Sequence, residues 1–412
     1  MKVAIIGGGA AGMMAAATIN ELDPKIEVFL IERNESLGKK VIISGGGRCN
    51  VTTGIEDIKT VLQNYPRGEK FLMSAMHAFS PAEVRAWFEN HDVQLKCEKD
   101  LRVFPVSDNG RDVVGVFEKI FSENKTKLLM GHAVAEIKKE NDAFIINFSK
   151  QPEIRVDVLI LAVGGQAFRR TGSTGDGYAM AESLGHSIAP LAASLHSFYI
   201  LEKWSKQLAG MSFVNANITA KGTKTHSRTG AFLFTHTGIS GPAVFALSSL
   251  TAHEPFGENH PLEFFIDFVP EISKDELTER LKKSIAENPK KSFKNTLHNF
   301  VPAKLAGLIC DALEFPAELK NAETNKQYLQ KSVEWLKKLP LNATGRGAGE
   351  EFVTAGGVKL TEVNPSTMES KICPGLYFAG EILDIDGFTG GFNLQASWAT
   401  GHMAGAKIAT QS

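Results

Sequence analysis

The feature that most constrains this chain is a glycine fingerprint at its start. Gly7, Gly9 and Gly12 follow the apolar run of residues 3–6, and an alanine-rich stretch follows them. In a strand–turn–helix unit of this kind, the first glycine permits a tight turn and the second lets the backbone approach a pyrophosphate. The third lets the helix pack close to the sheet, and the helix N-terminus binds the phosphates. The pattern therefore predicts a dinucleotide-binding βαβ unit.

An acidic residue follows this fingerprint at the spacing that such a unit requires. Residues 28–31 predict the second strand, and Glu32 closes it twenty residues after Gly12. A carboxylate at this place accepts hydrogen bonds from the ribose hydroxyls of an adenosine. Glutamate rather than arginine here favours an adenosine without a 2′-phosphate, as in FAD or NAD.

A second motif, near the C-terminus, favours FAD over NAD. Gly380 and Glu381 close an apolar run, and a helix is predicted from Asn393 onward. Because FAD is long, a second segment must reach its ribitol and flavin, and the Glu381 carboxylate can bind ribitol hydroxyls. The helix N-terminus can stabilise negative charge on the reduced flavin. Asp386 and Asn393 are interpreted as residues that orient the cofactor.

The loop 44–50 is predicted to pack against the flavin or the pyrophosphate. Its three consecutive glycines permit close approach of the backbone, and Lys40 and Arg48 offer positive charge. The loop holds one cysteine, Cys49, so the flavin-coupled dithiol of disulfide reductases is excluded. A packed, unreactive thiol is favoured over a nucleophile at this position.

Another glycine-rich turn follows a strand predicted at residues 156–163. Gly164 lies where a strand end approaches a dinucleotide for a second time. Asp176 stands in a Gly-Asp-Gly run before a predicted helix, and we interpret it as a helix cap rather than a catalytic residue.

The distribution of glycine predicts how the chain is organised. Only 7 of the 38 glycines lie in residues 191–344, although the chain has 412 residues and is long enough for two or three domains. We therefore predict an α/β fold with a discontinuous cofactor domain, residues 1–190 and 345–412. The insert would comprise a β-rich substrate domain at 191–270 and a small helical domain at 271–344.

The charge balance excludes some functions and leaves one open. The 45 Lys and Arg residues against 46 Asp and Glu exclude a dedicated nucleic-acid coat protein. Residues 282–294 hold five lysines against one glutamate, which is either an RNA-binding patch or, as we favour, a solvated helix face. The four cysteines form no CxxC pair, so neither a structural metal nor a disulfide framework is expected. Because no targeting segment and no run of ~20 apolar residues is visible, we expect a cytoplasmic protein without a membrane span.

These motifs together resemble one known family. The resemblance rests on the runs GGGAAG, SGGGRCN, GSTGDGY, FTHTGISGP, TAGGV and GLYFAGEILDIDGFTGGFNLQASWATG. They are similar to those of the bacterial FAD-dependent oxidoreductases often labelled aminoacetone oxidase-like, and the resemblance covers nearly the whole chain. Members of that family are assigned as an aminoacetone oxidase, a bile-acid double-bond reductase and a ribosomal-RNA dihydrouridine synthase. The resemblance implies a glutathione-reductase-like FAD-binding Rossmann domain with an inserted β-rich domain and a small helical domain.

The resemblance also implies which residues contact FAD. They come from the fingerprint, the loop 44–50, two further strand ends and the C-terminal motif. They are Gly7, Gly9, Ala10, Ala11, Gly12, Glu32, Arg33, Lys40, Ser44, Gly45, Gly46, Gly47, Arg48, Asn50, Val134, Ala162, Gly164, Gly380, Glu381, Asp386, Gly391, Phe392, Asn393, Leu394 and Gln395.

A flavin can carry the electron chemistry, so the chain has to supply a proton donor or base and an anchor. His236, between two threonines in a glycine-rich segment of the insert, is the first candidate for acid–base catalysis. A structural histidine in a turn is the alternative. Arg48 is the candidate anchor for an anionic substrate or for the flavin, and a structural ion pair is the alternative.

Three functions remain open, in this order. The first is NAD(P)H-driven reduction of an activated C=C bond, with uridine in ribosomal RNA as one candidate substrate. The second is oxygen-dependent oxidation of a small amine such as aminoacetone, and the third is non-catalytic FAD binding. Because no second strand–GxGxxG–helix unit is visible, NAD(P)H is expected to bind transiently at the active site. The sequence leaves the substrate and the oligomeric state open.

Overall fold

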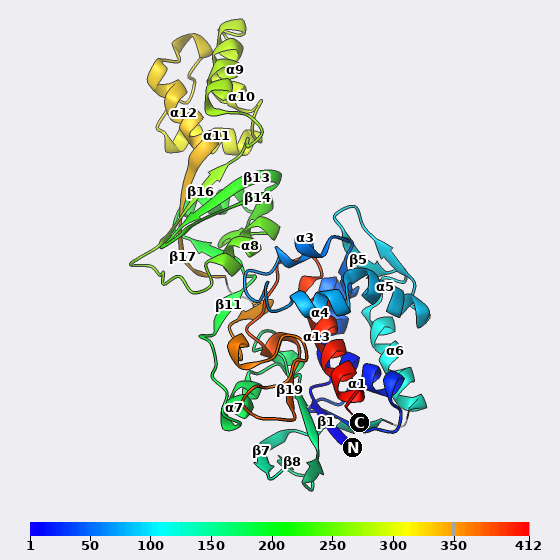
Figure 1. Ribbon diagram of the computed structural model, residues 1–412. Helices are drawn as coiled ribbons and strands as arrows, with labels where there is room; N and C mark the ends of the chain where they lie inside the picture. The colour runs from blue at the N-terminus through cyan, green and yellow to red at the C-terminus, as the bar shows by residue number, and fades with distance from the viewer. Residues whose placement is uncertain (125, 348–350, 412) are drawn as a thin grey trace. The chain divides into compact units, whose positions relative to one another are not determined.

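The computed structural model describes residues 1–124, 126–347 and 351–411, and the chain forms two compact units. Unit 1 comprises residues 1–194 and 350–412, and unit 2 comprises residues 195–349. The N-terminus of the chain lies in unit 1, and so does its C-terminal helix (Figure 1). The predicted separation of the insert into a β-rich and a helical domain stays a prediction.

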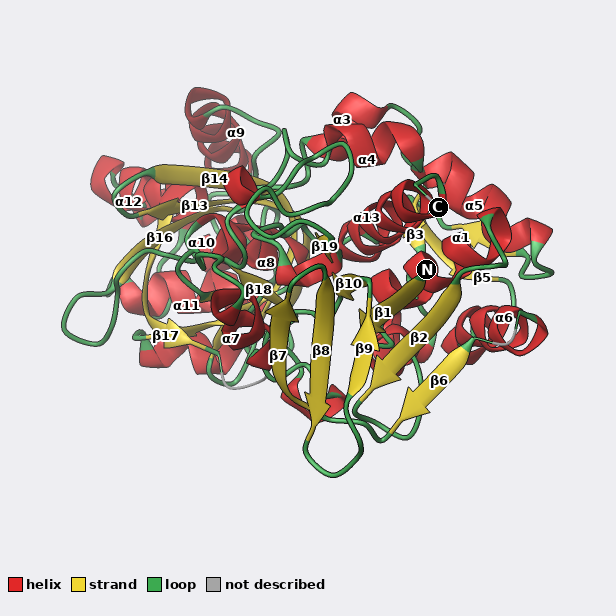
Figure 2. Cartoon of the chain, turned by 60° about the horizontal axis from the view of Figure 1, so that its bottom comes forward, coloured by secondary structure: helices red, strands yellow, loops and turns green. Residues whose placement is uncertain are grey.

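The centre of unit 1 is a five-stranded parallel sheet. Consecutive residues are buried in three of its five strands, β19, β10 and β1, as expected where both faces of a sheet are covered. β1 and β2 run side by side in Figure 2. The strand order is β19 (Leu376–Phe378), β10 (Val158–Leu161), β1 (Lys2–Ile6), β2 (Glu27–Glu32) and β6 (Lys127–Met130).

The strand predicted at residues 156–163 is divided in the structure. It is interrupted at Asp157, whose carboxylate accepts a hydrogen bond from the Lys2 backbone N–H at 2.7 Å. β10 follows this residue and joins the parallel sheet, whereas β9 (Ile154–Val156) pairs with β8 in a separate antiparallel sheet.

Two long helices of unit 1 pack closely on each other. α1 (Ala10–Leu22) and α13 (Phe392–Ala409) lie side by side in Figure 1. They approach so closely because α13 carries a glycine at the contact. A Cβ atom on Gly401 would lie 2.3 Å from the carbonyl oxygen of Ala11, closer than any side chain permits.

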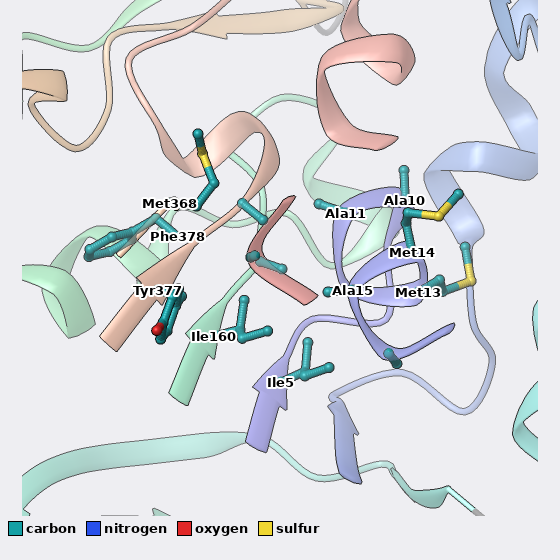
Figure 3. Close-up of a cluster of buried hydrophobic side chains, with 14 of the residues drawn as sticks. Ile5, Ala10, Ala11, Met13, Met14, Ala15, Ile160, Met368, Tyr377 and Phe378 are labelled. Atoms are coloured by element: carbon teal, nitrogen blue, oxygen red, sulfur yellow. The ribbon is translucent and has the colours of Figure 1, made fainter. Parts of the chain in front are cut away.

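The buried core of unit 1 joins the sheet to α1. Figure 3 shows Ile5 of β1, Ile160 of β10 and Tyr377 of β19 side by side, with Ala11 and Ala15 of α1 next to them. All five residues are 5% exposed or less. Burial of this apolar surface stabilises the fold by roughly 25 cal/mol per Å², and it holds β1, α1 and the turn between them in one arrangement.

Small antiparallel sheets and shorter helices complete unit 1. The alternating pattern of residues 133–138 and 143–148 predicts a hairpin around residues 140–142, and β7 and β8 confirm it. The sequence of residues 55–125 predicts mainly helices, and this prediction is partly wrong, because β4 and β5 pair with each other and β5 pairs with β3. These elements are β3 (Thr52–Thr53), β4 (Leu95–Cys97), β5 (Arg102–Pro105), β7 (Val134–Glu140), β8 (Ala143–Phe148), β11 (Ala192–Ser194), β18 (Val353–Ala355), α2 (Lys39–Ile43), α3 (Ile58–Leu62), α4 (Met73–Ala78), α5 (Pro81–Asn90), α6 (Gly110–Glu123) and α7 (Asp176–Ser183).

Unit 2 consists of a closed barrel and a group of helices. The order of the barrel strands is β12 (Phe198–Ile200), β15 (Gly238–Ser240), β14 (Thr225–Phe234), β13 (Ser212–Lys221), β16 (Leu262–Asp267) and β17 (Leu339–Arg346). Four helices gather at one end of the barrel (Figure 1). They are α9 (Lys274–Glu287), α10 (Phe293–Leu297), α11 (Ala303–Ala312) and α12 (Lys326–Lys338). One buried cluster runs from the barrel into these helices and includes Phe264 and Leu281.

The segment 191–270, which is predicted to be β-rich, also contains a helix. α8 (Pro242–Leu250) begins directly after Gly241, with proline at its first position. Proline is favourable there because its missing N–H would have no partner within the helix. The helix is short and apolar, so its sequence alone does not distinguish it from a buried strand.

Candidate cofactor and active site

The glycine fingerprint lies at the point where the strand order of the parallel sheet reverses. β1 pairs with β2 on one side and with β10 on the other, and ligands of open α/β sheets bind outside the carboxyl ends of the strands at such a point. Gly7, at the end of β1, has a φ of 109°. A Cβ atom on Gly7 would lie 2.4 Å from the carbonyl oxygen of Ala162, at the end of β10. The structure therefore brings these two predicted residues together.

The N-terminus of α1 opens onto free space beside this contact. Gly9 is its cap residue and makes no side-chain hydrogen bond, and a Cβ atom on Gly9 would meet no atom within 4 Å. Gly12 is different, because its Cβ atom would lie 1.9 Å from the Gly7 carbonyl oxygen. The backbone N–H groups of Ala10 and Ala11 begin the helix here. The open space and the helix N-terminus fit a pyrophosphate.

Glu32 ends β2 beside the fingerprint. Its Oε2 accepts a hydrogen bond from the Gly8 backbone N–H at 2.8 Å, and its Oε1 accepts one from the Asn34 backbone N–H at 2.8 Å. Since a carboxylate has about four lone-pair sites, Glu32 keeps capacity for a ribose hydroxyl. The arrangement fits the adenosine end of a dinucleotide.

The C-terminal motif reaches the same place. Lys40 Nζ lies 2.6 Å from Glu381 Oε2, although the two residues are 341 positions apart. The Thr354 backbone N–H donates to the other Glu381 oxygen at 2.9 Å. A Cβ atom on Gly380 would lie 2.8 Å from the Cβ of Ala11. The segment around Gly380 and Glu381 therefore lies against α1. A cofactor longer than NAD needs such a second segment beside the glycine fingerprint.

Burial and charge act together on one tyrosine near this ion pair. Tyr178 of α7 is 6% exposed, and its burial raises the pKa of its hydroxyl. The neighbouring Glu381 carboxylate raises this pKa further, because it disfavours a second negative charge. Tyr178 therefore stays protonated across the physiological pH range.

The loop 44–50 presents open glycine backbone. Gly45, Gly46 and Gly47 form a turn with φ of 58°, 74° and 91°, and the Ser44 hydroxyl before it donates to the Val41 carbonyl oxygen. Cβ atoms on Gly46 and Gly47 would meet nothing within 4 Å, whereas one on Gly45 would lie 2.9 Å from the Phe104 ring. The Asn50 side chain accepts a hydrogen bond from the Val103 backbone N–H at 3.3 Å, which holds the end of the loop. The open backbone fits a flavin or a pyrophosphate.

Within this loop, the Arg48 guanidinium forms ion pairs and the Cys49 thiol is buried. Arg48 donates to Glu98 at 2.5 Å and to Asp108 at 2.8 Å, and its guanidinium lies 3.8 Å from the centroid of the Phe104 ring. Arg48 therefore makes the structural ion pairs that were the alternative to a substrate anchor. Its role as an anchor stays a prediction. Cys49 is fully buried, and burial raises the pKa of its thiol to about 12. The predicted packed thiol is confirmed.

The side chains at the start of α13 hold the fold rather than an open site. The Asn393 amide bonds both the N–H and the carbonyl of Gly387, each at 2.8 Å. Gln395 is fully buried, accepts from the Thr52 hydroxyl at 2.6 Å and donates to the Phe79 carbonyl at 2.8 Å. A cofactor contact by residues 391–395 stays a prediction. Because the Asn393 and Gln395 side chains are engaged in these bonds, the backbone of the segment would make that contact. Phe392 is buried, Leu394 is partly buried, and a Cβ atom on Gly391 would lie 2.3 Å from the Thr52 carbonyl oxygen.

Asp386 has a partner that the sequence analysis missed. Its buried carboxylate forms an ion pair with Arg67 and accepts a hydrogen bond from the Ser194 hydroxyl at 2.7 Å. Arg67 lies 319 positions away in the chain. No local pattern marks it, because the pair forms only when the two segments pack together. The predicted role of Asp386 in orienting the cofactor stays a prediction.

Four further predicted residues lie in unit 1. Arg33 donates to the Thr174 hydroxyl at 2.7 Å and forms an ion pair with Asp176 at 3.0 Å. Gly175 is the cap of α7 and Asp176 its first residue, so the interpretation of Asp176 as the cap is wrong by one position. Val134 begins β7 and is partly buried, and a Cβ atom on Gly164 would lie 3.0 Å from the Ser173 hydroxyl.

The predicted residues of the insert lie in unit 2. His236 is exposed in the short loop between β14 and β15, and its catalytic role stays a prediction. In the lysine-rich stretch, Lys282 forms an ion pair with Glu279 at 2.7 Å, and Lys283 lies 3.9 Å from Glu287. These local pairs are typical of a solvated helix face.

The described part of the chain holds neither a group of metal ligands nor a helix that could span a membrane. Across residues 1–124, 126–347 and 351–411, no three His, Cys, Asp or Glu side chains are grouped so that they could hold a metal ion. Within the same residues, every helix is too short or too polar to cross a membrane.

The chain is similar to known proteins over nearly its whole length. A family model described as HI0933-like protein Rossmann domain matches residues 1–407. A Clostridium scindens protein named 3-dehydro-bile acid delta(4,6)-reductase is 30% identical over 411 residues, which are 99% of each chain. An Escherichia coli protein named ribosomal RNA dihydrouridine synthase is 28% identical over 403 residues, 96% of this chain and 95% of its own. The solved 3-ketosteroid delta1-dehydrogenase of Sterolibacterium denitrificans shares the fold, with a TM-score of 0.52 and 13% identity over 100% of this chain and 99% of its own.

Proposed function

Because this chain belongs to the HI0933-like family of FAD-dependent oxidoreductases, we propose that it reduces an activated C=C bond with electrons from NAD(P)H. Two relatives support this reaction class. One is named a delta(4,6)-reductase and the other a dihydrouridine synthase, and both names describe saturation of a ring double bond. They are 30% and 28% identical to this chain over nearly its full length, so they do not distinguish the two substrates.

One observation carries the proposal: three segments far apart in sequence meet at the reversal point of the sheet. Gly7 approaches Ala162, and Gly380 approaches Ala11. The Lys40–Glu381 ion pair closes the same region. A nucleotide of the length of NAD would need fewer of these segments, whereas FAD would be held by Glu32, the helix N-terminus and the C-terminal motif together.

Each part of this region has a proposed task. The N-terminus of α1 binds the pyrophosphate, and Glu32 binds the adenosine ribose. Lys40 and Glu381 orient the ribitol. When bound, FAD supplies hydride transfer. The candidate proton donor is His236, which is exposed in the loop between β14 and β15.

The overall reaction balances without another reactant. NAD(P)H loses a hydride and becomes NAD(P)⁺. In the overall reaction, one carbon of the substrate double bond gains a hydride, and the other carbon gains a proton from the protein or from water. Uridine of ribosomal RNA and cyclic enones both offer a double bond conjugated to a carbonyl group, so both are candidate substrates.

Anaerobic flavin spectroscopy tests this proposal. We expect NADH or NADPH to bleach the flavin absorbance of the purified holoprotein, and unmodified ribosomal RNA or an enone to restore it. The RNA arm should also yield dihydrouridine, measured by mass spectrometry of the digested nucleosides.

Two outcomes contradict the proposal and each supports another function. Rapid reoxidation by oxygen with peroxide release, after reduction by aminoacetone, would make the protein an amine oxidase. A flavin that no reductant bleaches would make it a non-catalytic FAD-binding protein. A His236→Gln variant should keep the bleaching step and lose the reoxidation by RNA or enone, since only the second step consumes the proton.

A further inference from the structure

The last residue of β17, Arg346, is turned toward the inside of the barrel by a β-bulge. Ala343 of this strand is fully buried, so strict alternation would point the Arg346 side chain outward. The ladder between β17 and β12 contains Thr344 as an extra residue, because Ala343 and Gly345 pair with consecutive residues of β12. Arg346 therefore pairs with Phe198, which is 1% exposed, and the two side chains share a face. Bulges re-aim side chains in this way, often next to functional sites.

The Arg346 guanidinium lies among aromatic rings and lacks an acceptor for one of its donors. It lies 4.8 Å from the centroid of the Phe256 ring, and that centroid lies 5.8 Å from the centroid of the Phe198 ring. One nitrogen, Nη2, donates to the Ala252 carbonyl oxygen at 2.7 Å. Another, Nε, is buried and has no hydrogen-bond partner among the described residues. The guanidinium therefore keeps a donor for which the described part of the chain supplies no acceptor.

Within the residues that the structure describes, no carboxylate balances the charge of Arg346. The side chain is half-buried, burial lowers the pKa of its guanidinium, and no neighbouring acid opposes that shift. Arg280 of α9 is different, because it is exposed and lies 2.5 Å from Glu276 Oε1. A charge that is removed from water is normally paired, since it otherwise loses its hydration without compensation. The bulge therefore places a cation on a partly buried face without an anionic partner.

One titratable side chain near Arg346 responds to its charge. The His196 ring has its centroid 4.9 Å from that of Phe198, and its Nδ1 lies 2.8 Å from the Ser197 carbonyl oxygen. Nδ1 therefore carries the proton of the neutral ring. Burial lowers the pKa of His196 to about 4, and the positive charge of Arg346 contributes to that shift. An anion bound to Arg346 would oppose this contribution, so His196 can report binding.

We propose that Arg346 and Phe256 form a binding site for an organic carboxylate, with the carboxylate paired to the guanidinium and the apolar part of the ligand against the Phe256 ring. A carboxylate matches a guanidinium in bidentate geometry. Phosphate would bring further oxygens that the surrounding aromatic rings cannot satisfy. The mouth of a β-barrel is a common place for a small ligand. The site lies wholly within unit 2, residues 195–349, so it stands independently of the proposed reaction.

Calorimetric titration of the FAD-loaded protein with benzoate and with benzamide tests the proposal. Benzoate should bind saturably, and benzamide, which has the same ring without the charge, should bind about tenfold more weakly or worse. Arg346→Gln should lower the affinity for benzoate about tenfold or more. Arg346→Lys should lower it less, because lysine keeps the charge and loses the bidentate geometry. Phe256→Leu should lower it about threefold, through loss of the ring contact.

The pKa of His196 gives a second measurement on the unaltered protein. Saturating benzoate should raise this pKa from about 4 to about 5 or higher, because the carboxylate offsets a nearby positive charge. Benzamide should leave it unchanged. The pKa is measured by NMR of labelled histidine, and comparison with the spectrum of His196→Asn identifies the resonance. This measurement keeps the proposal testable if Arg346→Gln fails to fold.

The matched control removes an arginine that already has a carboxylate partner. Arg280→Gln takes away the same charge in the same unit and should leave the affinity for benzoate unchanged. Equal affinities for benzoate and benzamide, wild-type affinity in Arg346→Gln, or an unchanged pKa of His196 would each overturn the proposal. So would tighter binding of inorganic phosphate than of benzoate, which would make the site one for inorganic anions. Bleaching of the flavin by NAD(P)H is measured separately, so failure of the proposed reaction and failure of this site are distinguishable.

Discussion

The cofactor region of unit 1 and the lysine-rich helix of unit 2 make their contacts in different ways. In unit 1, turns from distant parts of the chain touch through their backbones, as Gly7 touches Ala162 and Gly391 touches Thr52. In unit 2, the lysine-rich helix satisfies its charge locally, as Lys282 pairs with Glu279 three positions away. A site that forms by close backbone approach leaves a glycine pattern in the sequence. A run of surface charge leaves an equally visible pattern without forming a site.

Two alanine substitutions in the fingerprint test this comparison with the largest expected effect. Gly7→Ala should destabilise unit 1 by about 4 kcal/mol or more and abolish FAD binding, because its Cβ would lie 2.4 Å from a carbonyl oxygen at a φ of 109°. Gly9→Ala should fold normally, since its Cβ meets nothing within 4 Å. Its affinity for FAD should nevertheless fall, because the methyl group would occupy the space proposed for the pyrophosphate. Thermal unfolding and flavin content measure the two effects. Equal stability of the two variants would contradict the close-approach argument.

A core substitution in the barrel tests whether unit 2 contributes to cofactor binding. Phe264 is fully buried and packs with its ring centroid 4.9 Å from that of Phe198. Phe264→Ala should destabilise unit 2 by about 3–5 kcal/mol, from lost burial and a residual cavity. The fluorescence of Trp204 and Trp335, the tryptophans of unit 2, reports this unfolding. FAD content should stay at the wild-type level below the transition, and its loss there would show that the units share their stability.

Acid should weaken unit 2 through one buried histidine. Burial lowers the pKa of His196 from 6.5 to about 4, so the folded protein favours the neutral ring while the unfolded chain takes up a proton. Stability is therefore lost as the pH falls from about 6.5 to about 4, by about 3 kcal/mol. His196→Asn should remove most of this loss, measured by urea unfolding at pH 7 and pH 4.

A matched histidine in unit 1 sharpens that measurement. Burial also lowers the pKa of His186, but the Glu362 carboxylate 3.1 Å away opposes the shift. His186→Asn should therefore change the acid sensitivity less than His196→Asn does. A larger effect at His186 would reverse the assignment of the acid-sensitive unit.

The smallest predicted effect concerns the Lys40–Glu381 pair. Its side chains are 30% and 15% exposed, so solvent screens part of the attraction. A double-mutant cycle with Lys40→Gln and Glu381→Gln should give a coupling energy of about 1 kcal/mol in FAD affinity, measured by titration of the apoprotein. Additive effects of the two substitutions would mean that the pair does not act as one element of the cofactor site.

Several features of unit 1 were predictable because they depend on local pattern. The apolar run before Gly7 and the acid at position 32 predict β1, α1 and β2, and the structure has all three. The hairpin at residues 134–148 follows from alternation around a polar turn. α8 was missed because its apolar run, residues 242–247, fits a buried strand as well as a helix.

The chain by itself determined that a dinucleotide-binding sheet forms and that three glycine-rich segments belong to it, because tight turns and buried strands require particular residues at fixed short spacings. Only the tertiary structure decided which side chains remain available there. Arg48 meets Glu98 and Asp108, and Asp386 meets Arg67, because packing brings these segments together. The stacking of Phe168 on Phe352 has the same origin. A charge or a ring is visible in the sequence, but its partner depends on which distant segment the fold places beside it.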